Sequence, residues 1–157
     1  MYRTIDEFLT DWKMESDSTY KVLQALTDES LGQVVSPQDR TLGEIAWHIV
    51  TTLHEMMSRT GLVFDAPKKD APVPSSAQTI AERYRQASEA MAEAIRQQWT
   101  DETLQETTDM YGMQWTNAFT LSILIRHEIH HRGQMTVLMR QAGLRLPGVY
   151  GPSRDEV

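Results

Sequence analysis

Four long segments of the chain carry apolar residues at helical spacing, and no series of alternating apolar and polar residues competes with them. The second segment opens with Thr41 and Glu44, a Thr-x-x-Glu pair that matches a helix capping box. Four amphipathic helices in one short chain predict an all-α protein, an antiparallel four-helix bundle. The expected helices cover residues 5–26, 41–59, 77–99 and 117–142.

The connections between these helices differ in regularity. Residues 66–76 contain three prolines and are expected to span one end of the bundle. Residues 100–116 begin with a stretch that fits a short helical turn and continue as an extended or hairpin-like crossover before the last helix. The tail that follows Gly143 is rich in glycine and proline, so an irregular path is expected. A length of 157 residues fits one domain, residues 1–157.

Composition excludes several classes of function. A net charge of −7 disfavours nucleic acid as a partner, because binding to nucleic acid requires a basic surface. The absence of cysteine excludes disulfides, thiolate metal ligands and a cysteine nucleophile. No apolar run is long enough for a membrane span, and the N-terminal residues do not resemble a secretion signal. We therefore expect a cytoplasmic protein that does not interact with membranes.

The last helical segment carries three of the five histidines. His127 and His131 are four residues apart, so a helix places them on one face, with Gln134 almost in line. Leu124 and Leu138 share this face, which directs the two imidazoles toward the core. Two inward imidazoles one turn apart suit a divalent transition metal.

A third ligand is predicted in the second helical segment. His48 lies beside the apolar stripe of that segment, on a polar strip with Glu44, Thr52 and Glu55. Carboxylates near a histidine can support it as a metal ligand. We predict that His48 meets the two inward histidines of the last helix and completes a three-histidine site. His54 points to another side and is not counted as a ligand.

Other interpretations of the histidines stay open. His127 and His131 could be core residues satisfied by hydrogen bonds, although two inward imidazoles without a shared partner are costly. His130 lies to the flank and could support a ligand, move a proton or be a surface residue. His127-Glu128-Ile129-His130-His131 also matches the zinc-protease signature His-Glu-x-x-His. A peptidase is disfavoured, because no histidine follows His131 to serve as the third ligand.

Three stretches of the chain resemble the DinB/YfiT-like superfamily. They are His-x-x-His-His-Arg-Gly-Gln in the last helix, Trp47-His48 in the second helix and Pro-Gly-Val-Tyr-Gly-Pro in the tail. The resemblance implies a four-helix bundle, usually dimeric, in which His48, His127 and His131 hold one divalent metal. Characterised members include thiol-dependent S-transferases that use bacillithiol or mycothiol, and a mycothiol-dependent maleylpyruvate isomerase. Since one fold supports many reactions, the resemblance alone does not fix the activity.

These observations predict a protein that binds one divalent transition metal, which could be Zn, Ni or Fe. Three neutral imidazoles leave the charge of the ion uncompensated and leave coordination positions open. The leading prediction is a metal-dependent enzyme that transfers a low-molecular-weight thiol, its co-substrate, to a small electrophile. A metal-dependent hydrolase of a small substrate and a non-catalytic, stress-related metal-binding module are the alternatives. Glu44 and His130 are the candidate catalytic residues for proton transfer.

A homodimer is also expected. Ala118, Ile125 and Ile129 lie roughly opposite His127, so the last helix is apolar on two sides. A helix at the edge of a monomeric bundle needs only one apolar side. The second side therefore suggests contact with another copy of the chain, with a wrap of the tail over it as the alternative.

Overall fold

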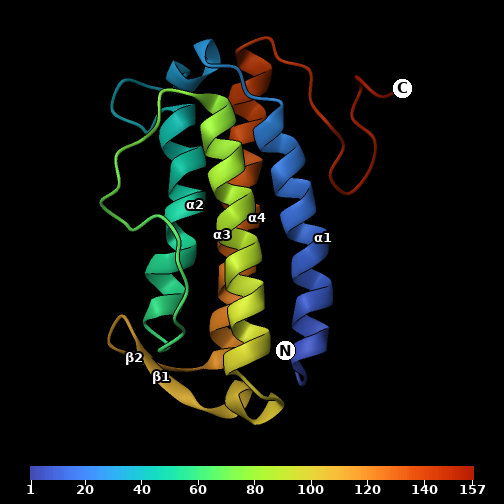
Figure 1. The fold of residues 1–157 in the computed structure, drawn as a ribbon. Coiled ribbons are helices and arrows are strands. Elements are labelled where there is room, and N and C mark those ends of the chain that lie inside the picture. Colours follow the sequence, from blue (N-terminus) through green and yellow to red (C-terminus); the bar gives the residue numbers. More distant parts are fainter.

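A computed structural model describes residues 1–157 and contains four long helices packed side by side (Figure 1). The four-helix bundle predicted from the sequence is confirmed, and each helix lies within its predicted range. None of the helices combines the length and the apolar composition needed to cross a membrane. The helices are α1 (Ile5–Gln24), α2 (Leu42–Ser58), α3 (Ala77–Gln98) and α4 (Asn117–Gln141), and the short elements are η1 (Glu29–Gly32), η2 (Asp101–Gln105), β1 (Thr107–Met110) and β2 (Met113–Thr116).

A hydroxyl side chain caps the start of every long helix. In each case its oxygen accepts a hydrogen bond from the backbone N–H three residues further on, which satisfies one of the free donors of the first turn. A cap of this kind stabilises a helix by about 1 kcal/mol. The four caps are Thr4, Thr41, Ser76 and Thr116.

The helices form two antiparallel pairs, α1 with α3 and α2 with α4 (Figure 1). The backbone N–H of Ile5 donates to Asp101, which joins the start of α1 to the end of α3. Val63 and Gln98 are joined by two hydrogen bonds, so α2 and α3 end close together and run in the same direction. Residues 66–76 therefore run back along the bundle (Figure 1). The expectation that they span one end is wrong, because α3 begins at the end of the bundle where α2 also begins.

The chain passes from α3 to α4 across one end of the bundle (Figure 1). Strands β1 and β2 pair antiparallel, with Thr107 opposite Thr116 and Met110 opposite Met113. The two residues between them, Tyr111 and Gly112, both have positive φ, as a two-residue type I′ hairpin turn requires. The predicted helical turn and hairpin-like crossover are thus both present.

Buried apolar side chains from all four helices form one continuous core. Within it, α4 packs against both α1 and α2, so it needs two apolar sides inside a single chain. Ala118 and Ile125 are only 2% and 6% exposed, and Ile129 is partly buried against the same core. The second apolar side of α4 is therefore no argument for a homodimer, contrary to the sequence interpretation. The dimer stays a prediction that rests on the family resemblance.

Candidate metal centre

Three histidines meet between α2 and α4. The ring centroids of His48 and His127 lie 4.8 Å apart, those of His48 and His131 also 4.8 Å, and those of His127 and His131 4.4 Å. Each ring offers one nitrogen to the cluster, and these three nitrogens all lie within 4.8 Å of one another. The structure thus brings together the three residues that the sequence nominated, from two helices that run in opposite directions.

The closest pair of donor atoms has the spacing that a divalent ion requires. The Nε2 atoms of His48 and His127 lie 3.0 Å apart. Two imidazole nitrogens at about 2.1 Å from one ion are separated by about 3.0 Å at a right angle and about 3.4 Å at a tetrahedral angle. An all-imidazole donor set suits Zn, Ni and Fe. The cluster could therefore hold a transition metal with coordination positions left over.

Gln134 fixes the orientation of His131. Its Oε1 lies 2.7 Å from His131 Nδ1, so Nδ1 carries the proton and donates it to the amide oxygen. His131 Nε2 then keeps its lone pair for an ion, as is usual for a histidine ligand held by a second hydrogen bond. The amide nitrogen of Gln134 lies 3.4 Å from His130 Nε2, which links His130 to the cluster indirectly. His127 Nδ1 is buried without a hydrogen-bond partner, so packing alone orients that ring.

The cluster favours neutral imidazoles. Burial lowers the pKa of His48 from 6.5 to about 4, with the positive charge of Arg40 as the second cause. Burial also lowers the pKa of His127 to about 4, followed by the charges of His131 and His48. The pKa of His131 is lowered as well, again mainly by burial. Because the folded chain resists protonation here, the stability of the metal-free protein is expected to fall as the pH drops from 6.5 toward 4.

The lowered pKa values predict the proton balance of metal binding. Three histidines with ordinary pKa values would release about two protons on binding an ion at about pH 6. We expect less than about one proton, because His48 and His127 are already neutral at that pH. Calorimetric titration of the metal in two buffers with different ionisation enthalpies measures the number. Release of about two protons would show that the imidazoles titrate normally.

A cavity of about 570 Å³ adjoins the histidine cluster. His131 and Gln134 of α4 form one wall, and the connection that precedes α2 forms the opposite wall. A volume of this size accommodates a small organic molecule. The remaining lining residues are Val35, Gln38, Asp39, Arg40, Ile45, Val137 and Leu138.

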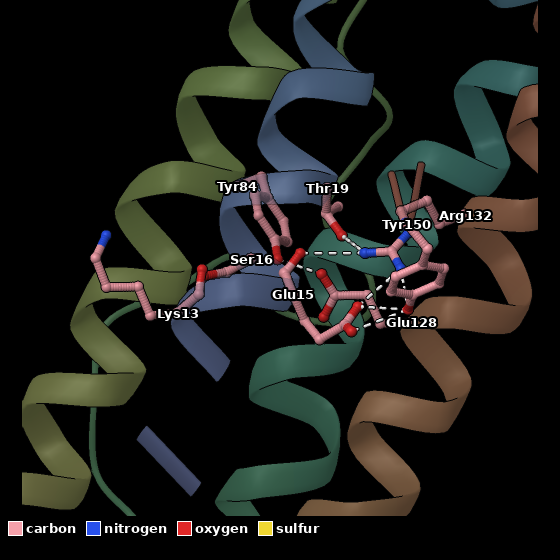
Figure 2. Close-up of polar contacts among 8 residues, drawn as sticks. All are labelled: Lys13, Glu15, Ser16, Thr19, Tyr84, Glu128, Arg132 and Tyr150. Atoms are coloured by element: carbon pink, nitrogen blue, oxygen red, sulfur yellow. Dashed lines mark hydrogen bonds and ion pairs between the residues drawn. The ribbon is translucent and has the colours of Figure 1, made fainter. Parts of the chain in front are cut away.

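A buried polar network lies on another side of α4 (Figure 2). Arg132 donates to the Glu15 carboxylate at 2.7 Å, to the Glu15 carbonyl at 3.1 Å and to the Thr19 hydroxyl at 3.1 Å. It also donates to the Tyr150 hydroxyl, which in turn donates to the Glu15 carboxylate. Arg132 and Glu15 are thus an ion pair whose side chains are only 2% and 9% exposed. The network ties α4 to α1 and to the tail.

Glu128 belongs to this network rather than to the histidine cluster. Its carboxyl group accepts a hydrogen bond from Tyr84, and burial raises the pKa of Glu128 to about 7. Glu128 and Arg132 directly follow His127 and His131, so each lies about 100° further round the helix. Along α4, residues that pack against α1 and α3 therefore alternate with residues that face α2. We infer that the network holds α4 at the rotation that points both imidazoles toward His48.

The sequence missed this network, although a signal was present. Glu15 and Thr19 fall on the same stripe of α1 as the buried Phe8 and Trp12. A charged residue on an apolar stripe requires a buried partner, because an unpaired buried charge is very costly. Arg132 is likewise a charged residue on a buried stripe of its helix, α4.

The remaining sequence candidates lie outside the cluster. His130 is exposed, and its ring centroid is 4.9 Å from that of His131. Glu44 is exposed in the first turn of α2, and its side chain has no hydrogen bond. Their catalytic roles stay predictions. His54 contacts Phe64 instead of the cluster, as expected for a residue that was not counted as a ligand.

Comparisons with known proteins agree with this fold. The whole chain, residues 1–157, matches the DinB family. It is 54% identical over 156 residues to the uncharacterized protein YrdA of Bacillus subtilis (strain 168), which covers 99% of this chain and 93% of YrdA. A solved DinB-like protein from Bacillus cereus has 53% identity and a TM-score of 0.93 over 96% of this chain and 100% of the other. The DinB-like protein YjoA from Bacillus subtilis has the same fold, with a TM-score of 0.72 at 20% identity over 91% of this chain and 97% of YjoA.

Proposed function

The chain belongs to the DinB family, and we propose that it is a metal-dependent enzyme that transfers a low-molecular-weight thiol to a small electrophile. The observation that carries the proposal is the meeting of three neutral imidazoles beside a cavity large enough for a small molecule. In the proposed site His48, His127 and His131 hold one divalent ion. The candidate metals are Zn, Ni and Fe, because imidazole is a suitable ligand for all three.

A divalent ion, when bound, would lower the pKa of a nearby thiol and so favour the nucleophilic thiolate. The residues of the chain have the other tasks. Gln134 holds the His131 ring in the tautomer that leaves Nε2 free. The cavity beside the cluster brings the two substrates together.

The proposed reaction breaks two bonds, S–H and the bond to the leaving group, and forms two, S–C and the bond from the proton to its acceptor. The thiol sulfur forms a bond to an electrophilic carbon, and the leaving group departs with the electron pair of its old bond. The thiol proton passes to a base and then to solvent. His130 is the preferred acceptor over Glu44, because its ring centroid lies only 4.9 Å from that of His131.

A thiol-consumption assay tests the proposal. Protein purified without a histidine tag is loaded with Zn, Ni or Fe in turn and incubated with mercaptoethanol and chlorodinitrobenzene while the thioether product is measured. We expect a rate above the uncatalysed reaction that falls by at least about 100-fold in His131→Ala, since a ligand is lost. His54→Ala is the matched control, because it removes a histidine that lies outside the cluster.

Two other outcomes would overturn the proposal. Hydrolysis of small esters or amides without thiol consumption would assign the site to a metal-dependent hydrolase. Absence of both activities in metal-replete protein would favour a non-catalytic metal-binding module.

A further inference from the structure

We propose that Arg40 binds a carboxylate on one of the small substrates and so selects for anionic molecules with an apolar body. The inference rests on the proposed function, because it concerns the same cavity. It goes further by naming the chemical class of the substrate and a residue that recognises it.

Arg40 is a free cation at the edge of the cavity. It directly precedes Thr41, the residue that caps α2, and it lines the cavity opposite His131 and Gln134. Its side chain is exposed, and none of the seven ion pairs of the structure involves it.

The charges around the cavity favour an anion. Asp39 also lines the cavity, but its carboxylate accepts a hydrogen bond from the Ser36 hydroxyl at 2.5 Å and forms no ion pair with Arg40. With a divalent ion on the histidines, positive charge exceeds negative charge at this place, although the whole chain has a net charge of −7. A guanidinium group matches a carboxylate in shape and can bind it through two parallel hydrogen bonds.

The rest of the cavity favours an apolar body. Val35 and Val137 line it from opposite walls and are 66% and 58% exposed, which places them among the few large apolar side chains open to solvent. Ile45 and Leu138 belong to the same lining. Exposed apolar residues that gather around a few polar groups are typical of a small-molecule site. A small aromatic or branched carboxylate fits both parts of the lining.

Binding of benzoate, compared with that of benzamide, tests the role of Arg40 without relying on turnover. Calorimetric titration of metal-replete protein is expected to show that benzoate binds at least about 10-fold more tightly than benzamide. Arg40→Gln is expected to weaken benzoate binding by about 10-fold or more and to leave benzamide binding unchanged. Arg40→Lys keeps the positive charge but lacks the planar guanidinium group, so it should restore part of the preference for benzoate over benzamide. Arg3→Gln is the matched control. Arg3 is an exposed arginine just before α1, and α1 and α2 begin at opposite ends of the bundle (Figure 1).

Metal-free protein separates Arg40 from the metal as the carboxylate receptor. The Arg40→Gln effect is expected to persist without metal. If the preference for benzoate survives in Arg40→Gln and disappears on metal removal, the ion alone binds the carboxylate and the inference is wrong. Equal binding of benzoate and benzamide to the wild-type protein would also overturn it. Neither result bears on the proposed reaction. Conversely, if Arg40→Gln weakens benzoate binding but the wild-type protein shows no turnover, only the proposed reaction is overturned.

Kinetics then identify which substrate carries the carboxylate. Mercaptopropionate is compared with mercaptoethanol as the thiol, and chloronitrobenzoate with chlorodinitrobenzene as the electrophile. Arg40→Gln should raise KM for the carboxylated member of one pair, with little change in kcat, because it removes binding and not chemistry. Unchanged KM values for both carboxylated members would contradict the inference.

Discussion

Replacement of Arg132 with leucine is expected to lower the free energy of unfolding by about 3–5 kcal/mol. Arg132 supplies the positive charge of the buried network that joins α1, α4 and the tail (Figure 2). Its loss leaves the carboxylate of Glu15 buried with only the Tyr150 hydroxyl as a partner. An uncompensated buried charge is among the costliest defects that a single substitution can create. Urea denaturation of the metal-free protein measures the change.

Two further variants show whether the charge is the cause. Arg126→Leu removes an exposed arginine from the same helix and is expected to change the free energy by less than about 0.5 kcal/mol. The double variant Glu15→Met with Arg132→Leu removes both charges and should recover a large part of the loss. If the double variant is as unstable as the sum of the two single variants, the ion pair is not the source of the effect.

Replacement of His131 with alanine is expected to weaken divalent-metal binding by more than about 100-fold, beyond the 10–100-fold typical of a residue that only supports a ligand. The reason is that His131 Nε2 is one of three donors in the cluster, and the other two cannot replace it. Competition with a chromophoric chelator measures the affinity. His48→Ala should have a comparable effect, because its ring stands 4.8 Å from both partner rings.

Substitutions of residues near His131 should weaken metal binding to different degrees. Gln134→Ala is expected to weaken metal binding by about 10–100-fold, because His131 loses the hydrogen bond that sets its tautomer. His130→Ala is the matched control and should change the affinity by less than about 10-fold, since His130 reaches the cluster only through Gln134. Equal effects of His130→Ala and His131→Ala would mean that the metal is bound elsewhere on α4.

The sequence predicted the helices well because their signals are local. The helical spacing of apolar residues and the cap at Thr41 depend only on neighbouring residues. The path of residues 66–76 was predicted wrongly, because it depends on the end of the bundle at which α3 begins. That choice is made by contacts between helices far apart in the sequence, such as the packing of α3 against α1.

The three-histidine cluster was predictable for a similar reason. The spacing of His127 and His131 already fixes two rings on one face, and His48 was the remaining histidine beside a core stripe. The buried network was missed because Glu15, Arg132 and Tyr150 come from three distant segments, each of which contains ordinary polar residues.

A crystal structure of metal-replete protein, purified without a histidine tag and measured at the absorption edge of the metal, would show directly whether the three histidines bind one ion. We expect one anomalous peak at about 2.0–2.2 Å from one nitrogen each of His48, His127 and His131. Metal-replete protein whose only peak lies elsewhere, with His48 and His127 joined by a direct hydrogen bond instead, would contradict it.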